Sequence, residues 1–385
     1  MAKLGEVCDI LNGYAFKSNQ YTTSGVRIIR ISNVQKGYIE DKSPVYYPCD
    51  DENVKKYELK QNDLLISLTG NVGRTALLEE KFLPAALNQR VSCVRLKEPD
   101  KVLKTYLFHL LNSDYFEQQC MKAAEGVAQK NLSPKWLFEY KIPIYSIERQ
   151  KEISNTLDKI DLLIILRKQQ LAKLDELVKA RFVEMFGDEQ TFNKEPLSQN
   201  VEEMFIGPFG SSLKNESFVS KENGYCMVYE QKHAIRKTMD VETRYIDKPK
   251  YEELKRFSIH GGDIIVSCRG TIGETYIVPL NAPLGIMHPS IMKIRVKDSI
   301  YNRVFFDFLL QEKLKQHEAQ ANGSGVKMAV TASALGKEEF IVPSIPFQNQ
   351  FAAFVERVDQ QKQTVQQSLK KLELMKKALM QEYFG

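Results

Sequence analysis

The sequence predicts an α+β protein built from two tandem copies of one mixed domain, with a long helix after each copy. Short segments with shared residues recur about 200 positions apart, and about 40 residues nearly free of proline and glycine follow each copy. The 385 residues are too many for one ordinary domain. The 43% of hydrophobic residues is enough for two cores.

Short segments rich in β-branched residues and bounded by turn residues are typical of strands. In the first copy we expect strands at 26–31, 64–68, 75–78 and 91–96, and in the second at 264–268, 275–278 and 291–296. Helical segments are expected at 102–124 and 302–321. This order favours a mixed α+β domain over a βαβ array.

The strongest internal match lies around one of these strands. NDLLISLTGNVG at 62–73 matches GDIIVSCRGTIG at 262–273, so Asp63, Ser67, Gly70 and Gly73 each recur 200 positions later. The Gly-x-x-Gly pair joins two strands in each copy, where glycine allows positive φ.

A second match precedes each long helix. KIPIYSIERQ at 141–150 aligns with IVPSIPFQNQ at 341–350, which pairs Pro143 with Pro343 and Gln150 with Gln350. Solenoid repeats have units of about 20 to 50 residues, so this longer period indicates two whole domains.

Each long segment is predicted to be one helix of about 60 Å, at about 1.5 Å per residue. Apolar residues recur at spacings of three, four and seven, as in a coiled-coil seam. They are Ile153, Leu157, Ile160, Ile164, Leu171, Leu174, Val178 and Met185 in the first helix, and Phe351, Val355, Val358, Val365, Leu372, Met375 and Leu379 in the second.

Such a stripe needs a partner, and we expect the two helices to pair as an antiparallel coiled coil with pseudo-twofold symmetry. The C-terminus then lies near the start of the first domain. The alternative is that each helix packs on its own domain. Gly187 and Gly385 follow the two helices and are expected to form left-handed caps.

The predicted division of the chain is therefore a first domain at 1–146, a helix at 147–187, a second domain at 188–345 and a helix at 346–385.

Composition and motifs exclude several classes of protein. The six cysteines form no CxxC pair, so neither a disulfide framework nor a zinc module is supported, and a reducing compartment is expected. No apolar run could span a bilayer and no signal peptide is evident, so we expect a cytoplasmic protein with no membrane partner. A net charge of +5 permits a polyanionic partner without requiring one.

The usual catalytic signatures are absent from the sequence: no P-loop, HExxH, GxSxG or Rossmann fingerprint occurs. We interpret the five histidines as structural because none repeats between the copies: His109, His233, His260, His288 and His317. Asp63 and Asp263 precede strands, where a turn-forming role is favoured over a metal site. We therefore expect no catalytic residue, cofactor or metal ion in this chain.

Glu58 and Lys60 mimic part of the active site of metal-dependent nucleases. The similar pair Glu253 and Lys255 lies at a different distance from the strand that follows, so the two copies do not align here. A stand-alone nuclease is therefore a minor hypothesis.

Two diverged domains on a rigid connector suit the reading of a linear polymer at two points. Double-stranded DNA fits, because twofold readers contact half-sites about one helical turn apart. Basic and polar loop residues are the candidate contacts, since they can donate to bases and phosphates. These are Lys17, Ser18, Arg30, Asn33, Arg74, Gln89, Arg90, Gln129 and Lys130 in the first copy, and Ser211, Ser212, Lys214, Gln231, Lys232, Arg269 and Lys327 in the second.

Taken together, these motifs resemble the specificity subunit of Type I restriction-modification systems. The resemblance rests on the two glycine-containing segments, on KIPIYSIERQ and IVPSIPFQNQ before the helices, on the long helix, and on the duplication of the whole order. It covers essentially the full chain. Asn62, Tyr145 and Ser344 depart from the common pattern.

The resemblance implies that each domain is a target recognition domain for one half of a bipartite DNA target, and that the helices fix the spacer. It also implies two modification subunits, which carry S-adenosylmethionine and methylate adenine by base flipping, and restriction subunits that can join them. On this reading the loops at 126–130 and 323–327 and the turn at 88–90 face DNA. The alternative is a coiled-coil scaffold that binds proteins without DNA.

Overall fold

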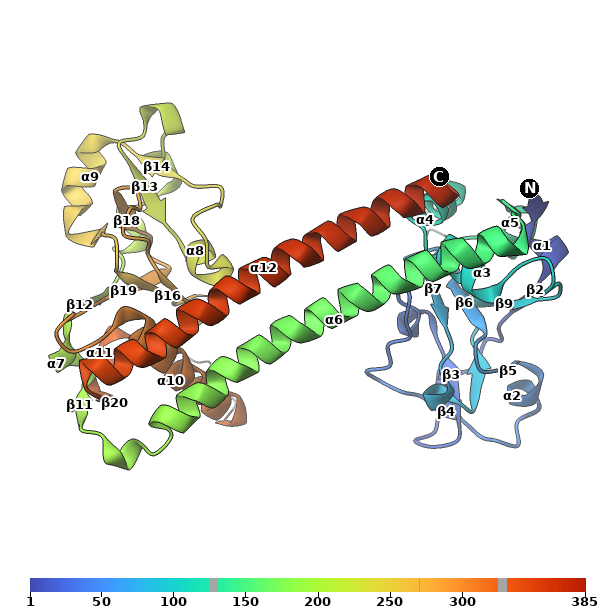
Figure 1. Cartoon of the computed structure of the whole chain (residues 1–385), viewed down its shortest axis with the longest axis horizontal. Helices are drawn as coiled ribbons and strands as arrows, with labels where there is room; N and C mark the ends of the chain where they lie inside the picture. The colour runs from blue at the N-terminus through green and yellow to red at the C-terminus, as the bar shows by residue number, and fades with distance from the viewer. Residues whose placement is uncertain (125–130, 270, 325–330) are drawn as a thin grey trace. The chain divides into compact units, whose positions relative to one another are not determined.

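A computed structural model describes residues 1–124, 131–269, 271–324 and 331–385 (Figure 1). The chain divides into two compact units, the first formed by 1–170 with 365–385 and the second by 171–364. Two helices of 40 residues, α6 (Ile147–Phe186) and α12 (Ile345–Phe384), each contribute one part to each unit.

The first unit contains two four-stranded sheets, in the orders β2-β9-β6-β7 and β4-β3-β8-β5. The strands are β2 (Cys8–Asn12), β3 (Val26–Ile29), β4 (Tyr46–Tyr47), β5 (Glu58–Leu59), β6 (Leu64–Ser67), β7 (Thr75–Leu77), β8 (Ala85–Leu87) and β9 (Val91–Leu96). The first sheet is antiparallel, whereas β3 and β8 pair in parallel. A short sheet joins β1 (Ala2–Lys3) to β10 (Lys141–Ile142).

The second unit repeats this topology, with sheets β12-β19-β16-β17 and β14-β13-β18-β15. The strands are β12 (Val201–Ile206), β13 (Cys226–Tyr229), β14 (Tyr245–Ile246), β15 (Ser258–Ile259), β16 (Ile264–Ser267), β17 (Thr275–Ile277), β18 (Gly285–Met287) and β19 (Ile291–Val296). The short sheet pairs β11 (Lys194–Pro196) with β20 (Glu339–Ile341). The shared strand order confirms two copies of one mixed domain.

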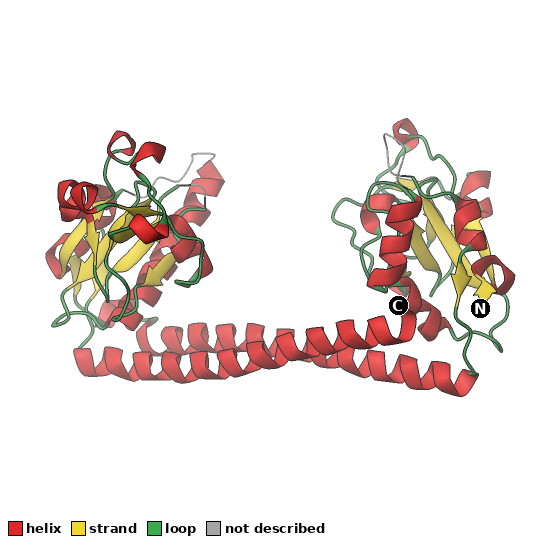
Figure 2. Ribbon diagram, turned by 90° about the horizontal axis from the view of Figure 1, so that it is seen from above, coloured by secondary structure: helices red, strands yellow, loops and turns green. Residues whose placement is uncertain are grey.

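Helices lie beside the strands within each unit (Figure 2). In the first unit these are α1 (Leu4–Val7), α2 (Glu52–Lys56), α3 (Lys104–Leu111), α4 (Asp114–Ala123) and α5 (Pro134–Glu139). In the second they are α7 (Leu197–Asn200), α8 (Gln231–Arg236), α9 (Lys248–Leu254), α10 (Arg303–Ser324) and α11 (Ala332–Lys337).

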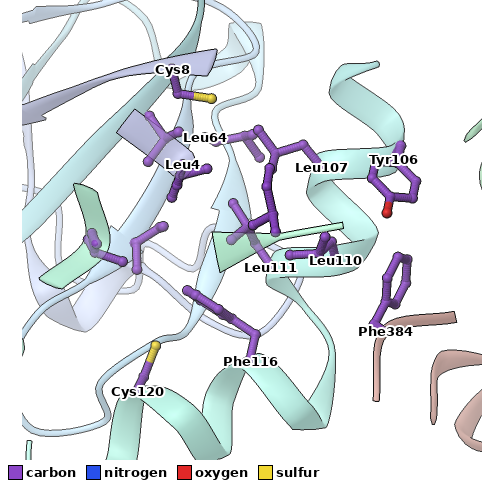
Figure 3. Close-up of a cluster of buried hydrophobic side chains, with 14 of the residues drawn as sticks. Leu4, Cys8, Leu64, Tyr106, Leu107, Leu110, Leu111, Phe116, Cys120 and Phe384 are labelled. Atoms are coloured by element: carbon purple, nitrogen blue, oxygen red, sulfur yellow. The ribbon is translucent and has the colours of Figure 1, made fainter. Parts of the chain in front are cut away.

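Strand β6 shows how each domain builds its core. All four of its residues are buried, because both faces of the strand are covered. Leu64 lies in a cluster with Leu107 and Leu111 of α3 (Figure 3). Ile66 belongs to the same cluster, whereas Leu65 belongs to the cluster that contains residues of the second sheet. Period-two alternation therefore buries both faces of this strand.

The helix expected at 102–124 is divided in two, contrary to the prediction. The side chain of Ser113 accepts a hydrogen bond from the amide of Phe116 and donates one to the carbonyl of Leu110 at 2.7 Å. This serine cap starts α4 directly after α3 ends, and serine is among the preferred N-cap residues.

Within each unit the two long helices run antiparallel. In the first unit Asp161 pairs with Lys376 and Lys168 with Glu373, with N···O distances of 2.5 and 3.8 Å. In the second unit Lys362 pairs with Asp175 at 2.6 Å, and the ring centroid of Phe347 lies 5.1 Å from that of Phe186. Residue numbers rise along α6 while they fall along α12, so the predicted antiparallel pairing is confirmed in each unit.

The C-terminus lies in the core of the first unit, as expected. Phe384 is only 7% exposed and its ring centroid lies 5.6 Å from that of Tyr106 (Figure 3). The hydroxyl of Tyr145 also donates to the carbonyl of Tyr383 at 3.4 Å. The helices thus pair with each other and also enter the domain cores, so the two packing alternatives occur together.

The predicted glycine conformations are partly confirmed. Gly70, Gly73 and Gly273 have φ of 70°, 82° and 87°, as the strand connections require, and Gly270 lies outside the described residues. The left-handed cap predicted at Gly187 is wrong. Its φ is not positive, and its amide continues the helical pattern by donating to the carbonyl of Val183 at 2.8 Å.

The repeat register before the second helix differs from the predicted one. Gln150 is fully buried, and its amide bonds the backbone of Leu103, Lys101 and Tyr145 at 2.8 to 2.9 Å. The residue that repeats this role is Gln348, which bonds the backbone of Asn302, Ile300 and Pro343 at 2.7 to 2.8 Å. Gln350 is exposed, so its pairing with Gln150 was wrong by two residues.

Candidate nucleic-acid interface

In the first unit a cleft of about 630 Å³ lies where several chain connections meet. It is lined by the end of β2, the segment after β6, the β8–β9 turn and the start of α5: Asn12, Leu68, Thr69, Gln89, Arg90, Asn131, Leu132, Ser133 and Pro134. Two predicted contacts, Gln89 and Arg90, are therefore brought together at one end of the sheet.

The backbone of this cleft is fixed by hydrogen bonds, while the side chains of Asn12, Gln89, Arg90 and Asn131 are exposed. The amide of Leu68 donates to the carbonyl of Arg90 at 3.0 Å, and the amide of Leu132 donates to the carbonyl of Leu68 at 2.7 Å. The backbone amide of Gln89 donates to the carbonyl of Tyr14 at 2.9 Å. A guanidinium and a carboxamide on a rigid turn can donate to base edges and phosphates.

The second unit builds the same frame with other side chains. The amide of Cys268 donates to the carbonyl of Ser290 at 2.9 Å, as Leu68 does to Arg90. Ser290 thus stands at the place of Arg90, and Arg269 at the place of Thr69. Arg90 in the first unit and Arg269 in the second lie at this end of their sheets, but they belong to different strand connections.

Two predicted contacts of the second unit, Lys232 and Arg269, lie in one neighbourhood. Burial lowers the pKa of His288, and the charges of Glu230, Arg244, Arg269 and Lys232 act on the same ring. Lys232 is paired with Glu230 at 2.7 Å, so part of its charge is already neutralised. The exposed Arg269 is the freer cation of the two.

Asn33 is buried and organises its loop, and its contact with DNA stays a prediction. Its side-chain oxygen accepts from the amide of Arg30 at 2.8 Å, and its nitrogen donates to Glu40 and Asp41 at 2.9 and 3.0 Å. At the same place in the second unit, His233 accepts from the amide of Glu230 at 3.0 Å through Nδ1. Comparison of the two copies at this position was the signal for a structural role.

Arg30 and Arg74 are half-buried and hydrogen-bonded within the first unit. The guanidinium of Arg30 donates to the carbonyl of Ser43 at 2.7 Å, and that of Arg74 donates to Gln35 at 2.6 Å. They support the loops around the interface, and a contact to DNA would have to share or replace these bonds.

The remaining predicted residues occupy short surface turns. Lys17 and Ser18 begin the 3₁₀ turn at Ser18–Gln20, and Ser211 and Ser212 belong to the turn at Gly210–Ser212. Lys214 is exposed just after that turn, and Gln231 starts α8. Gln129, Lys130 and Lys327 lie outside the described residues, as do the loop at 126–130 and most of the one at 323–327.

Sequence reasoning missed an ion pair at the opposite end of each sheet, between a buried aspartate and a half-buried arginine. Asp63 accepts from Nε and Nη2 of Arg95 at 2.8 and 2.6 Å and from the amide of Lys60 at 2.7 Å. Asp263 makes the same bonds with Arg295 at 2.6 and 2.8 Å. Because arginine and a turn amide occupy both carboxylates, the turn-forming role of the two aspartates is confirmed.

In the described part of the chain, no group of three or more His, Cys, Asp or Glu side chains could hold a metal ion. Within the same residues, no helix is long and apolar enough to cross a bilayer. The six cysteines are free thiols.

The sequence matches the family described as the Type I restriction modification DNA specificity domain, once over residues 1–176 and again over residues 203–374. The specificity subunit of the type I restriction enzyme MjaVIII, from Methanocaldococcus jannaschii, is 32% identical over 186 residues. These residues are 46% of this chain and 43% of that relative, so the chain covers less than half of its length.

Two further comparisons extend over the whole chain. A provisionally named MjaX specificity subunit of the same organism is 22% identical over 400 residues, covering 98% of this chain and 91% of that protein. The crystal structure of the type I restriction-modification S subunit from M. genitalium is 16% identical, with a TM-score of 0.57 over 100% of this chain and 95% of that one. At this identity the likeness shows the fold.

Proposed function

Since the chain belongs to the type I restriction-modification DNA specificity family, we propose that it is the specificity subunit of such a complex and reads a bipartite duplex target. Each unit contacts one half-site. The turn regions of Arg90 in the first unit and Arg269 in the second supply the base and phosphate contacts.

One observation carries this proposal: the same backbone frame presents different side chains in the two units. Gln89 and Arg90 line the cleft of the first unit, whereas Pro289, Ser290 and Arg269 occupy the matching places in the second. Two units with the same backbone but different hydrogen-bond donors can bind two half-sites of different sequence, because a protein distinguishes bases by the pattern of donors and acceptors on their edges.

The proposed partners are double-stranded DNA, two modification subunits and, in a restricting complex, restriction subunits. Exposed apolar side chains on α6 and α12 within the first unit support docking of another protein: Leu162, Leu163, Ile165, Leu166, Leu374 and Met375. Large apolar side chains that gather on the surface of a folded protein usually mark an interaction surface. In this proposal the modification subunits hold S-adenosylmethionine and catalyse methylation, this chain contributes no catalytic group, and the complex acts in the cytoplasm.

The helices are proposed to set the distance between the half-sites. Inserting four residues, about one helical turn, near Gln169 and near Gln367 lengthens both helices. The recognised spacer should then lengthen while each half-site stays unchanged. A changed half-site with an unchanged spacer would contradict this role.

The test of the proposal is selection from a random duplex library by the chain reconstituted with its modification subunits. We expect two short conserved elements separated by a fixed run of unspecified bases, with binding that weakens as salt rises. Recovery of DNA without a bipartite consensus would refute the proposal.

The second candidate function is a coiled-coil scaffold that binds proteins without DNA, and the exposed apolar side chains on the helices support it too. It predicts partner binding that is insensitive to mutation of Arg90 and Arg269, and no duplex affinity above that of a neutral protein. A nuclease acting through the exposed Glu58 and Lys60 instead predicts Mg²⁺-dependent cleavage by the isolated chain.

A further inference from the structure

Phe209 is the most exposed aromatic side chain in the second unit among the described residues, at 86% of its full accessible surface. It lies in the sequence Gly207-Pro208-Phe209-Gly210, directly after strand β12. An aromatic ring left in water is unfavourable by the apolar area that it could bury. The exposed ring therefore indicates a contact with another molecule.

The backbone on both sides of Phe209 is held in place. The amide of Gly207 donates to the carbonyl of Ile291 at 3.0 Å, and the carbonyl of Phe209 accepts from the amide of Ser212 at 2.8 Å. A Cβ atom on Gly207 would lie 2.3 Å from the carbonyl oxygen of His288, so glycine allows this loop to sit against the β18–β19 turn. The ring is thus presented on a fixed loop.

The matching loop of the first unit has no aromatic residue at the place of Phe209. Gly13 sits against the carbonyl oxygen of Asn88 as Gly207 does against that of His288, so Ala15 stands at that place and the next residue, Phe16, fills a core position. Phe16 is 6% exposed and its centroid lies 4.8 Å from that of Tyr47. In the second unit the nearby core position after the loop is filled by Leu213, which is 5% exposed. The core of the second unit is complete without the ring of Phe209.

Phe209 lies at the end of the sheet proposed to face DNA. Its loop packs against the turn at His288, and Ser290 of that turn bonds Cys268, the residue before Arg269. Exposed polar side chains follow it directly, at Ser211 and Lys214. A rigid aromatic ring among cations and hydroxyls is the arrangement that proteins use to stack on bases beside a phosphate backbone.

We propose that Phe209 is an apolar contact to the second half-site and stacks against a base step there. This inference rests on the proposed function of the chain. Arg269 and Lys214 neutralise the nearby phosphates, and the ring then buries its face against the bases. The residue at the matching place of the first unit is Ala15, which has no ring, so the contact serves one half-site only.

The test measures dissociation constants of complexes reconstituted with the modification subunits, on the full target and on targets with either half-site scrambled. Phe209→Ala is compared with Phe209→Tyr, which keeps the ring. The matched control is Leu280→Ala, because Leu280 is 78% exposed near Gly261 at the opposite, Asp263 end of the sheet. Melting temperatures check that each variant is folded.

Phe209→Ala should weaken binding of the full target about tenfold, the scale of one lost stacking contact. The loss should persist when the half-site of the first unit is scrambled and vanish when the half-site of the second unit is scrambled. Phe209→Tyr and Leu280→Ala should bind like the unmodified chain. Unchanged affinity for Phe209→Ala, or an equal loss on all duplexes, would overturn the inference. If the unmodified complex itself fails to distinguish target from scrambled DNA, the proposed function fails instead.

Discussion

Replacement of Phe384 by alanine should destabilise the first unit, although the residue is next to last in the chain. The residue is only 7% exposed, and its ring packs against Tyr106. A buried phenylalanine removes about 200 Å² from water, worth about 5 kcal/mol at about 25 cal/mol per Å². Allowing for residual burial in the unfolded chain, we expect a loss of about 4 kcal/mol.

Urea unfolding followed by tryptophan fluorescence measures this loss in the first unit alone. Trp136 is the only tryptophan, and its ring lies 5.0 Å from Tyr140 within that unit. With a slope of about 2 kcal/mol per molar urea, the midpoint should fall by about 2 M. Phe384→Leu keeps most of the side-chain volume and should lower the free energy of unfolding by about 1 kcal/mol. It can be measured even if Phe384→Ala does not fold.

The matched control is Phe186→Ala in the second unit. Phe186 ends α6 as Phe384 ends α12, and it is 1% exposed, 4.7 Å from Phe305. Its replacement should leave the Trp136 transition nearly in place while lowering a second transition seen by circular dichroism. Equal shifts of the Trp136 midpoint in the two variants would refute the assignment of the C-terminal helix end to the first unit.

Three further predictions concern buried polar groups and thiols. Gln150→Leu should lower the free energy of unfolding by about 3 kcal/mol, because it leaves buried backbone groups unpaired. Gln350 is exposed, so Gln350→Leu should change that free energy by less than about 0.5 kcal/mol. Similar effects of the two substitutions would contradict the corrected register. Burial lowers the pKa of His109, so folding favours its neutral form. Stability should therefore be steady above about pH 6.5 and fall below it. In melting curves recorded at several pH values, His109→Gln should make that fall smaller. The exposed Cys49 should react first with a thiol reagent at pH 8, because burial raises the pKa of the Cys8 thiol to about 12; a fast phase that survives Cys49→Ser would be inconsistent with this.

Sequence reasoning captured the features that repeat with a constant offset or a regular period. Asp63 and Gly73 recur at 263 and 273 because each fixes a backbone turn, and turns tolerate few residue types. The long helices followed from their 3.6-residue period and from the lack of helix breakers. These constraints are local in the sequence, and the duplication lets them be recognised by comparing the two copies.

Features that depend on packing between distant segments could not be read in this way. The offset of 200 falls to 198 before the second helix, and only the hydrogen bonds of Gln150 and Gln348 reveal where the shift ends. Asn33 has the sequence context of a surface amide, yet its partners lie seven and eight residues away in a folded loop. Phe209 gives no signal in the sequence, because the exposure of an aromatic residue depends on the folded surface around it.

The most direct test of the central claim compares the DNA sequences selected by three reconstituted complexes: the unmodified chain, Arg90→Ala and Arg269→Ala. If each unit reads one half-site, Arg90→Ala should relax base preference in one element of the consensus and Arg269→Ala in the other, with the spacer unchanged. A loss of preference in the same element for both variants, or in neither, would contradict the account.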